Sequence, residues 1–390
     1  MEIVHIMPSA PYNEGWGYQD NILPKYHALL GNNVTIITTD LEQKDGKLIQ
    51  VNTSEYKSKD GFKVIRKNIV RKLGIPYISV YSELECIKPD YVFFHGLVSA
   101  TIFEVTRYKK TVNPNLIIVQ DNHLDYNIGY NPGINFKNNI RCFMYRIMFQ
   151  INEKYIDKVY GVTPWRKQYA EQVFKVPYEK TDVLIMGADD QHLDFKNSKE
   201  IRNNIRKQYE IEDDEFLILS GGKIDKKKKI EILMQACSNM ENVKLLLFGT
   251  VSEECKNEFD RILEQSDNII YIGWIESASY YNYCFASDLV FFPGQHSVLW
   301  EQACASKIPC VFSKWPGMDH VDIGGNCDFI EVVDEKSIIE EINSLLFTEK
   351  YQMMKEVAQS SLTDVFLYSK IAEKSINDLF GEKNESIMGM

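Results

Sequence analysis

FFPGQHSVLWEQACASKIPCVFSKW, residues 291–315, has the pattern of a strand, a tight loop, a helix and a second strand. We expect the helix to begin after Pro293-Gly294, directly beyond an apolar strand, with Glu301 in its first turn. A glutamate there favours the positive end of the helix, so capping is one interpretation. The carboxyl ends of strands in an open α/β sheet are also where ligands bind, which gives a second interpretation.

The composition is that of a globular protein with more than one domain. The chain has 390 residues, enough for two or three domains with separate cores. Apolar residues make up 44% and charged residues 25%, which argues against a disordered chain. The formal net charge of -11 argues against a general nucleic-acid binder, so no nucleic-acid partner is expected.

The cysteines and the apolar runs indicate where the protein works. Eight cysteines are scattered without a CxxC pair or a ligand-like spacing, so neither a metal site nor a disulfide framework is predicted. The start, MEIVHIMPSAP, lacks a basic flank and is interrupted by Pro8, so it does not resemble a signal peptide. No apolar run approaches the ~18 residues that span a bilayer. We expect a cytoplasmic protein, with contact at the inner face of the membrane as an alternative.

Apolar, β-branched runs alternate with helical stretches in both halves, which predicts parallel sheets covered on both faces. In the first half the predicted strands are 2–7, 34–38, 91–95, 116–120 and 158–162, and the helices lie near 18–30, 98–110 and 139–155. In the second half the predicted strands are 216–220, 243–248, 268–272, 288–292 and 309–312, and the helices lie near 228–239, 252–265, 277–286, 297–306 and 335–346. This pattern predicts an α/β protein with two doubly wound, Rossmann-like domains facing a cleft.

The polar stretch 187–212 marks the expected junction between the domains. We therefore assign 1–190 to the first domain and 191–365 to the second. Residues 366–390 form a closing helix and tail, which could pack on either domain. The helix predicted at 139–155 carries an apolar stripe that we expect to be core: Ile140, Phe143, Met144, Ile147 and Ile151.

Three loops after strands of the second half have unusual residues. GGKIDKKKK (221–229) places five lysines after two glycines, and a solvated face explains some of them equally well. Lys223 follows the glycines and Lys228 lies where the next helix begins, so we expect these two to bind a diphosphate. Gly249, and Gly273 before Trp274, would remove bulk where a base or ribose lies.

The helix start in the opening segment completes the candidate site. The N–H groups of Ser297, Val298 and Leu299 could bind phosphate oxygens, because the first amides of a helix lack intrahelical partners. Glu301, one turn in, could accept hydrogen bonds from a ribose diol.

Segments in both halves stand in a recognisable order. In the second half they are GGKIDKKKKIEILMQA, FGT, YIGWI and SVLWEQACASKIPCV, and in the first half EIVHIMPSAP, GWGYQ, ALLGNNVTIITTD, DYVFFHGL and KVYGVTPWRKQYAEQ. The set resembles the retaining glycosyltransferases of family 4, which have the GT-B fold. The resemblance covers most of the chain. It implies a nucleoside-diphosphate sugar, UDP-linked, as the donor, and no bound cofactor.

The resemblance also implies roles for individual residues. Lys223 and Lys228 would bind the donor diphosphate, Glu301 the ribose hydroxyls, and the main chain near Trp274 and Ile275 the base. From the first domain, the loop with Gly15 and Gly17 would face the donor, and His123 would lie near the reacting sugar. These expected donor contacts also include Gly249, Ser297, Val298 and Leu299.

One position departs from the family pattern. The family has two glutamates eight positions apart, and the position eight before Glu301 is Pro293. Gln295 or His296 could take over contact with the donor sugar, and His296 could equally be a loop residue that caps the helix. The identity of the sugar is therefore left open.

The implied reaction is a metal-independent hexosyl transfer with retention of configuration. No aspartate-rich pair lies in the right loop, so lysines and a helix start would stabilise the leaving diphosphate. Asp121 is a candidate for electrostatic support of the reacting sugar, and capping of a loop is the alternative.

Three other functions are considered. A dinucleotide oxidoreductase is disfavoured because Asp20 stands where the third glycine of the fingerprint belongs. A sugar-nucleotide epimerase or phosphorylase has little support. A non-catalytic sugar-nucleotide-binding protein is credible because the first glutamate is missing.

The acceptor is the least defined partner. A glycan, a lipid-linked intermediate or a small molecule are all compatible, with surface polysaccharide synthesis as the expected setting. The loop 125–139 is expected on the acceptor side. The segment FKVIRKNIVRKL (62–73) has five basic residues and could touch an anionic membrane surface, although a basic strand edge is the commoner meaning.

Overall fold

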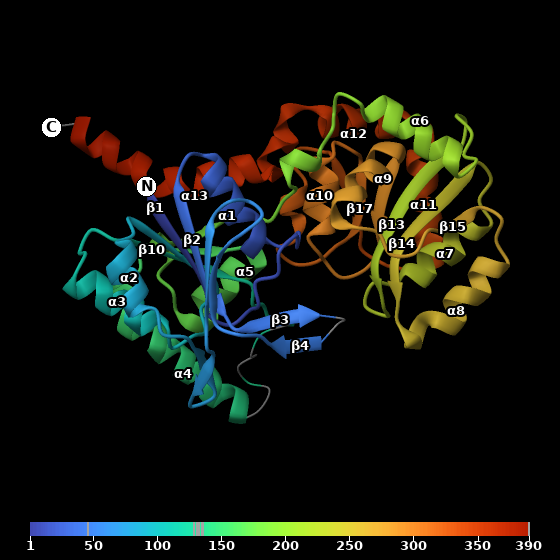
Figure 1. Cartoon of the computed structure of the whole chain (residues 1–390). Coiled ribbons are helices and arrows are strands. Elements are labelled where there is room, and N and C mark those ends of the chain that lie inside the picture. Colours follow the sequence, from blue (N-terminus) through green and yellow to red (C-terminus); the bar gives the residue numbers. More distant parts are fainter. Residues whose placement is uncertain (45–46, 128, 130–132, 134–135, 389–390) are drawn as a thin grey trace. The chain divides into compact units, whose positions relative to one another are not determined.

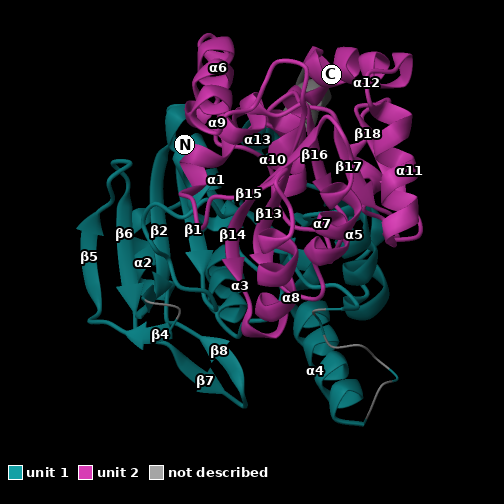
Figure 2. Cartoon of the chain, turned by 90° about the vertical axis from the view of Figure 1, so that its right-hand side faces the viewer, with its two compact units in different colours: residues 1–185, 371–390 teal, residues 186–370 magenta. Residues whose placement is uncertain are grey.

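The fold was analysed on a computed structural model of the chain, which describes residues 1–44, 47–127, 129, 133 and 136–388. The chain divides into two compact units (Figure 2). Unit 1 comprises residues 1–185 and 371–390, and unit 2 comprises residues 186–370. Each unit is described separately below.

Unit 1 is built on an eight-stranded sheet in the order β12-β11-β10-β9-β1-β2-β6-β5 (Figure 1). Its strands are β1 Glu2–Met7, β2 Asn33–Thr39, β5 Ser54–Lys57, β6 Lys63–Lys67, β9 Tyr91–Phe94, β10 Ile117–Asn122, β11 Lys158–Gly161 and β12 Thr181–Val183. All neighbours run parallel except β5 and β6, which are antiparallel. The central strands are buried along their length because helices cover both faces, so their sequences are predominantly apolar.

Within its described residues, unit 1 also contains two hairpins and six α-helices, besides short 3₁₀ and π-helical segments. The hairpins are β3 Leu41–Lys44 with β4 Lys47–Gln50, and β7 Val70–Lys72 with β8 Ile75–Tyr77. The helices are α1 Gln19–Leu29, α2 Tyr81–Ile87, α3 Ile102–Thr111, α4 Phe136–Asn152, α5 Pro164–Tyr169 and, from residue 371 on, α13 Tyr368–Met388. Within α13, Ile371, Ala372 and Ser375 are buried.

The predicted core stripe on α4 is wrong. Ile140, Phe143, Ile147 and Ile151 are exposed, with 60% of Phe143 and 58% of Ile151 open to solvent. The face that α4 buries is the neighbouring one, with Cys142, Tyr145, Met148, Phe149 and Asn152. Helical spacing identifies residues that share a face, but both faces of this helix are apolar, and the spacing cannot tell which one packs inward.

Unit 2 is built on a six-stranded sheet in the order β15-β14-β13-β16-β17-β18, with every neighbouring pair parallel. Its strands are β13 Phe216–Ile224, β14 Val243–Val251, β15 Ile269–Tyr271, β16 Leu289–Phe292, β17 Cys310–Ser313 and β18 Cys327–Ile330. Its helices are α6 Ser198–Gln208, α7 Ile230–Ser238, α8 Glu253–Glu264, α9 Tyr280–Ala286, α10 Leu299–Ala305, α11 Glu335–Leu345 and α12 Glu349–Gln359.

The predicted fold class is confirmed: both units are α/β, with parallel, Rossmann-like sheets. Some details differ. The polar stretch 187–212 contains α6, which packs on α9 of unit 2. Residues 221–224, predicted as a loop, extend β13 and pair with β14 as far as Val251.

Two further features are the state of the cysteines and the character of the helices. Each of the eight cysteines, all of them within the described residues, is a free thiol. No helix in the described part of the chain combines the length and the apolarity needed to cross a bilayer.

Candidate functional sites at the two switch points

The order in which the chain adds strands to the unit 2 sheet reverses between β13 and β16. From β13 the chain proceeds outward through β14 and β15, and from β16 it proceeds to the other edge through β17 and β18. Ligands of open α/β sheets bind beyond the carboxyl ends of strands at such a switch point. The two loops that meet there are 225–229, after β13, and 293–298, after β16.

Lys228 joins these two loops. Its ammonium group donates to the carbonyl of Gln295 at 2.5 Å, and Gln295 N donates to Lys227 O at 3.0 Å. A Cβ on Gly294 would lie 2.4 Å from Lys227 O, so only glycine allows this approach. Burial lowers the pKa of Lys228 to about 8, although Asp225 opposes the shift. A half-buried cation therefore sits beside the start of α10.

Lys223 differs from Lys228. Its side chain is 75% exposed, and its ammonium lies 3.7 Å from Asp225 Oδ2. It stands on β13 itself, near the end of the strand. The structure thus brings Lys228, but not Lys223, into contact with the loop that precedes α10.

The glycines of this region serve the protein backbone. Gly249 has φ +116°, and a Cβ there would lie 1.8 Å from the carbonyl oxygen of Gly222 on the neighbouring strand. Its amide donates to Gly273 O at 2.7 Å. Close strand packing therefore explains Gly249 without a base or ribose. Beyond Gly273, Trp274 is 70% exposed and Ile275 is half-buried.

Glu301 is enclosed by two imidazoles. Its Oε1 accepts from His296 Nε2 and from His320 Nε2, each at 2.9 Å. Glu301 is fully buried, and its Oε2 and His320 Nδ1 are buried without a hydrogen-bond partner. Burial alone would raise the pKa of Glu301, but His296 and His320 outweigh it and hold the pKa well below its usual range. The carboxylate is therefore ionised, with one oxygen in use and one spare.

The helix begins two residues later than predicted. α10 begins at Leu299, so Ser297 and Val298 precede it and all three residues are half-buried. Trp300 N donates to Ser297 O, and Gln302 N to Val298 O. These bonds use the carbonyl groups of Ser297 and Val298. The amides of residues before a helix have no i–4 carbonyl in the helix to donate to.

Unit 1 has its own switch point, between β1 and β9. The loop after β1 contains Gly15 and Gly17, with φ +81° at Gly15, a conformation that glycine adopts readily. The loop ends at α1, where Asp20 Oδ1 lies 3.3 Å from His95 Nδ1. His95 follows β9, so the glycine loop and the end of β9 are tied together.

Asp121 and His123 lie at the same edge of the unit 1 sheet. Asp121 is fully buried at the end of β10, and its Oδ2 contacts His95 Nδ1 at 3.0 Å and His123 Nε2 at 3.2 Å. Its Oδ1 accepts from Gly96 N at 2.7 Å. Asp121 has no exposed surface, so its side-chain contacts are with the two imidazoles and the Gly96 amide. His123, with a side chain 38% exposed, is the member of the group that reaches solvent.

The contacts continue inward as a chain of imidazoles. His95 Nε2 lies 3.1 Å from His5 Nδ1, and His5 Nε2 lies 2.9 Å from His27 Nδ1. His27 Nε2 then contacts Ser375 Oγ of α13 at 2.8 Å. Four of the seven histidines thus form one buried path from α13 to His123.

The imidazoles along this path differ in charge. Burial would lower the pKa of His95, but Asp20 and Asp121 raise it to about 10. Burial and the neighbouring His95 lower the pKa of His27 to about 3. Burial would raise the pKa of Asp121, but His123 and His95 hold it well below its usual range. At neutral pH the path contains an imidazolium at His95 between two carboxylates, and neutral rings at His5 and His27.

Sequence reasoning missed His95, Asp20 and His320. His95 ends the strand YVFFH, two positions before Leu97, and its place after a buried strand was a usable signal. Asp20 was considered only as a substitution in a glycine fingerprint. His320 gave no signal, because it lies 19 residues beyond Glu301, in the short 3₁₀ helix Asp319–Val321. The loop 125–139, expected on the acceptor side, includes residues outside those described.

Three groups have ligand atoms close enough to hold a metal ion. They are Cys304, Cys310 and Cys327; His296, Glu301 and His320; and Asp20, His95 and Asp121. Hydrogen bonds or ion pairs within the last two groups account for their geometry without an ion. The His₂Glu set also has the donor atoms that zinc accepts.

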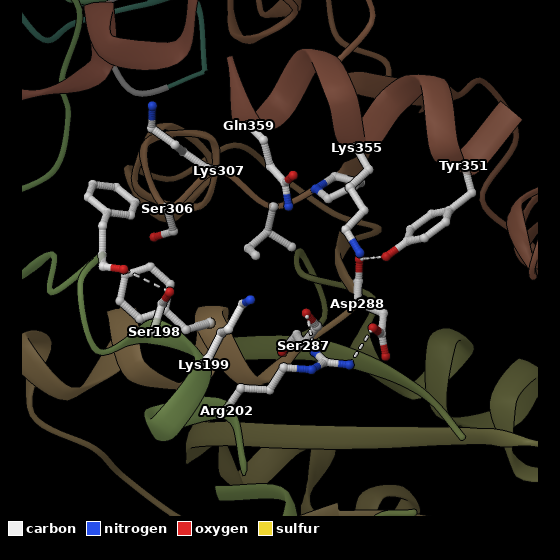
Figure 3. A pocket seen from close by; sticks show the side chains of 14 residues that line it. Ser198, Lys199, Arg202, Ser287, Asp288, Ser306, Lys307, Tyr351, Lys355 and Gln359 are labelled. Atoms are coloured by element: carbon white, nitrogen blue, oxygen red, sulfur yellow. Dashed lines mark hydrogen bonds and ion pairs between the residues drawn. The ribbon is translucent and has the colours of Figure 1, made fainter. Parts of the chain in front are cut away.

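A separate hollow of about 370 Å³ lies at the opposite edge of the unit 2 sheet (Figure 3). Asp288 and Pro309, which line it, directly precede β16 and β17, so this is the amino edge. Two of its cations are engaged in the protein: Arg202 pairs with Asp288 at 2.7 Å, and Lys307 pairs with Asp364 at 2.9 Å. Ligands are expected at the other edge, so we interpret this hollow as structural.

Both units are α/β, with parallel, Rossmann-like sheets and a switch point in each. Residues 201–361, which lie within unit 2, match the family described as Glycosyl transferases group 1. This part of the chain is therefore similar to glycosyltransferase group 1 domains.

Curated relatives match part of the chain. It is 24% identical over 183 residues to a processive diacylglycerol alpha-glucosyltransferase of Acholeplasma laidlawii, covering 44% of this chain and 54% of the relative. It is 24% identical over 191 residues to a lipopolysaccharide 1,2-N-acetylglucosaminetransferase of Salmonella typhimurium, covering 44% and 50%. The chain thus spans about half the length of the curated relatives it matches.

Solved structures match over nearly the whole chain. A glycosyltransferase from Rickettsia africae superposes with a TM-score of 0.70 at 16% identity, covering 96% of this chain and 97% of that one. HepE from Anabaena, solved in complex with UDP, superposes with a TM-score of 0.70 at 14% identity, covering 98% and 100%. At these identities the likeness establishes the fold.

Proposed function

We propose that the protein is a retaining glycosyltransferase that moves a hexosyl group from a UDP-linked sugar to an acceptor. The observation that carries the proposal is the similarity of residues 201–361 to glycosyltransferase group 1 domains, in a unit whose switch point brings Lys228 and Glu301 to one edge of a parallel sheet. The acceptor is a glycan, a lipid-linked intermediate or a small molecule. We propose surface polysaccharide or glycoconjugate synthesis in the cytoplasm as the setting.

The donor site belongs to unit 2. Lys228 supplies a partly buried positive charge beside the amides before α10, and Lys223 adds a second, solvated one. Together they would stabilise the charge that develops on the departing diphosphate, so the proposed reaction needs no metal. The Anabaena structures solved with UDP and with UDP-glucose, on the same fold, support UDP as the nucleotide.

Glu301 would bind the ribose through its unpartnered Oε2. Because the carboxylate is enclosed in this structure, binding requires His296 or His320 to turn aside. In unit 1, His123 would face the reacting sugar, while Asp121 and His95 hold its ring. In the transfer step the bond between the anomeric carbon and the diphosphate breaks, and the acceptor oxygen bonds to that carbon from the same face.

A non-catalytic sugar-nucleotide-binding protein is the second candidate. The observations that favour it are Pro293 in place of the first glutamate of the pair and the enclosed state of Glu301. Such a protein would bind the same nucleotides without cleaving the sugar.

A two-stage experiment tests the proposal. Thermal shifts with a panel of nucleotides and sugar nucleotides identify the donor, since a ligand at 100 times its Kd adds about 2.7 kcal/mol of stability. Transfer or slow donor hydrolysis is then measured for the wild type and for His123→Ala. We expect His123→Ala to keep nucleotide affinity and lose turnover. Donor binding without cleavage by the wild type would favour the second candidate.

A further inference from the structure

The exposed apolar face of α4 is part of a larger surface on unit 1. A groove of about 480 Å³ runs between α4, α3 and the hairpin β7–β8. Exposed apolar side chains from all three elements line it: Leu73, Phe103, Phe143, Ile147 and Ile151. We call this surface the α4 face. A contiguous exposed apolar patch marks an interaction site, whereas apolar residues scattered singly do not.

The tip of the hairpin is the most exposed point of the α4 face. Leu73 is 92% exposed, and it forms a two-residue turn with Gly74 in which both φ angles are positive, 52° and 80°. Such turns favour asparagine or aspartate at the first position, because these side chains tolerate the left-handed conformation. A leucine there suits neither the backbone nor water, which indicates a function outside the folded unit.

The charges around the α4 face are basic. α4 carries Lys137, Arg141 and Arg146 and no acidic residue, in a chain whose net charge is -11. Arg71 and Lys72 on the hairpin are exposed. The acidic residue of the groove, Glu104, uses its carboxylate to accept from the amides of Val80 and Tyr81.

Within the basic segment 62–73, the first three cations have partners inside unit 1, so only the last two border the α4 face. Lys63 pairs with Glu55 at 2.6 Å, Arg66 donates to Tyr12 O, and Lys67 pairs with Glu83, so these three cations are used within unit 1.

The cations that border the α4 face are those of the hairpin and of α4. Arg71 donates to Gly74 O at 3.2 Å, and the Lys72 ammonium lies 3.3 Å from the centroid of the Tyr77 ring, but both side chains remain exposed. On α4, Arg146 donates to Val173 O at 3.2 Å.

We propose that the α4 face docks on an anionic lipid bilayer, with Leu73, Phe143 and Ile147 entering the headgroup boundary and the flanking cations contacting lipid phosphates. Apolar side chains rimmed by lysine and arginine are the pattern of interfacial binding, and anionic lipids attract each nearby cation. The inference goes beyond the proposed function, because it requires neither donor nor acceptor.

Co-sedimentation of the full chain with vesicles tests the proposal. We expect binding to phosphatidylcholine vesicles that contain phosphatidylglycerol, weaker binding to phosphatidylcholine alone, and loss at high salt. Phe143→Ser with Ile147→Ser should weaken binding by about a hundredfold, roughly tenfold for each buried side chain. Arg71→Gln with Lys72→Gln should weaken binding to the anionic vesicles by on the order of fivefold for each cation.

Leu73→Asn separates docking from folding. Asparagine suits the turn, so the thermal midpoint should stay equal or rise while vesicle affinity falls by about tenfold. Val332→Asn is the matched control: Val332 is 60% exposed but lies on unit 2, and its substitution should leave binding unchanged. Absence of wild-type binding, or equal binding of all variants, overturns the proposal. So does a wild-type dimer in sedimentation velocity, without vesicles, that Leu73→Asn dissociates.

Discussion

Each unit holds a buried carboxylate between two imidazoles at the carboxyl edge of its sheet. In unit 1, Asp121 contacts His95 and His123, and in unit 2, Glu301 contacts His296 and His320. The two sets have similar distances, but they differ in what remains unused.

Asp121 has both oxygens occupied, because Gly96 N donates to Oδ1. Glu301 has a buried Oε2 without a partner. A buried acceptor that lacks a partner is destabilising by about 1–3 kcal/mol, and native proteins rarely retain one without a reason. The comparison indicates that Asp121 is part of the scaffold that holds His123, whereas Glu301 is prepared for a ligand.

The largest expected effect comes from Asp121→Asn. It leaves the imidazolium of His95 short of one of its two carboxylates, and breaking a buried charge pair is destabilising by about 3–5 kcal/mol. Urea denaturation should show this loss in the free energy of unfolding, with turnover lost as well. His123→Asn is the control, since the more exposed ring should be far less important for stability. Equal losses for the two variants would contradict the scaffold role.

Glu301→Gln should act on ligand binding more than on folding. If Oε2 binds the ribose, affinity for the nucleoside diphosphate should fall by about 1.5–3 kcal/mol, measured by calorimetry. Glutamine keeps a carbonyl acceptor for the histidines, so the fold should survive. Glu301→Ala is expected to destabilise the fold, because two buried imidazoles would lose their acceptor. Unchanged nucleotide affinity in Glu301→Gln would refute the ribose assignment.

Substitution of the two lysines of the donor loop should affect nucleotide affinity to different extents. Lys228→Met should weaken nucleotide binding by about 1.5–3 kcal/mol, since a partly buried charge is screened less by solvent. Lys223→Met should lower affinity by less than about 1 kcal/mol, because its side chain is largely exposed. Calorimetry with the nucleoside diphosphate measures both, and the double variant should lose donor binding. A larger effect at Lys223 would reverse the assignment.

The histidine path of unit 1 should make stability depend on pH in both directions. His27, with its pKa lowered to about 3, contributes stability above pH ~6.5 that is lost as pH falls. His95, with its pKa raised to about 10, contributes stability below pH ~6.5 that is lost as pH rises. Each slope is at most about 1.4 kcal/mol per pH unit. His27→Asn should flatten the acid limb of the urea-unfolding profile, and His95→Asn the alkaline limb.

Removal of metal should have the smallest effect. Transfer is expected to persist in excess EDTA, because lysines stabilise the leaving group. The His₂Glu set of unit 2 makes this a sharp test, since its donor atoms suit zinc. Activity that is lost in EDTA and restored by a divalent metal would assign that set a different role.

The strands of both sheets could be predicted from the sequence, but the side-chain contacts at the two switch points could not. Strands such as β1 and β14 are predominantly apolar, which marks them as buried in parallel sheets. The pairing of Asp121 with His95 arises because β9 and β10 are neighbours, a long-range fact that no local pattern carries. Lys223 is exposed and Lys228 is half-buried because β13 continues to Ile224 and the chain turns only after it. The glycine pair at 221–222 suggested that the strand ends earlier.

Unit 1 consists of two pieces that the whole of unit 2 separates in the chain. Its second piece supplies Ser375, which contacts His27 and accepts a hydrogen bond from Tyr91 at its carbonyl. During synthesis on the ribosome, therefore, the unit that is started first is finished last. Residues 186–370 have all emerged, and can fold as a domain, before Ser375 is available to His27. A chain truncated before residue 371 would contain all of unit 2 but would lack Ser375, the partner of His27 at the end of the histidine path.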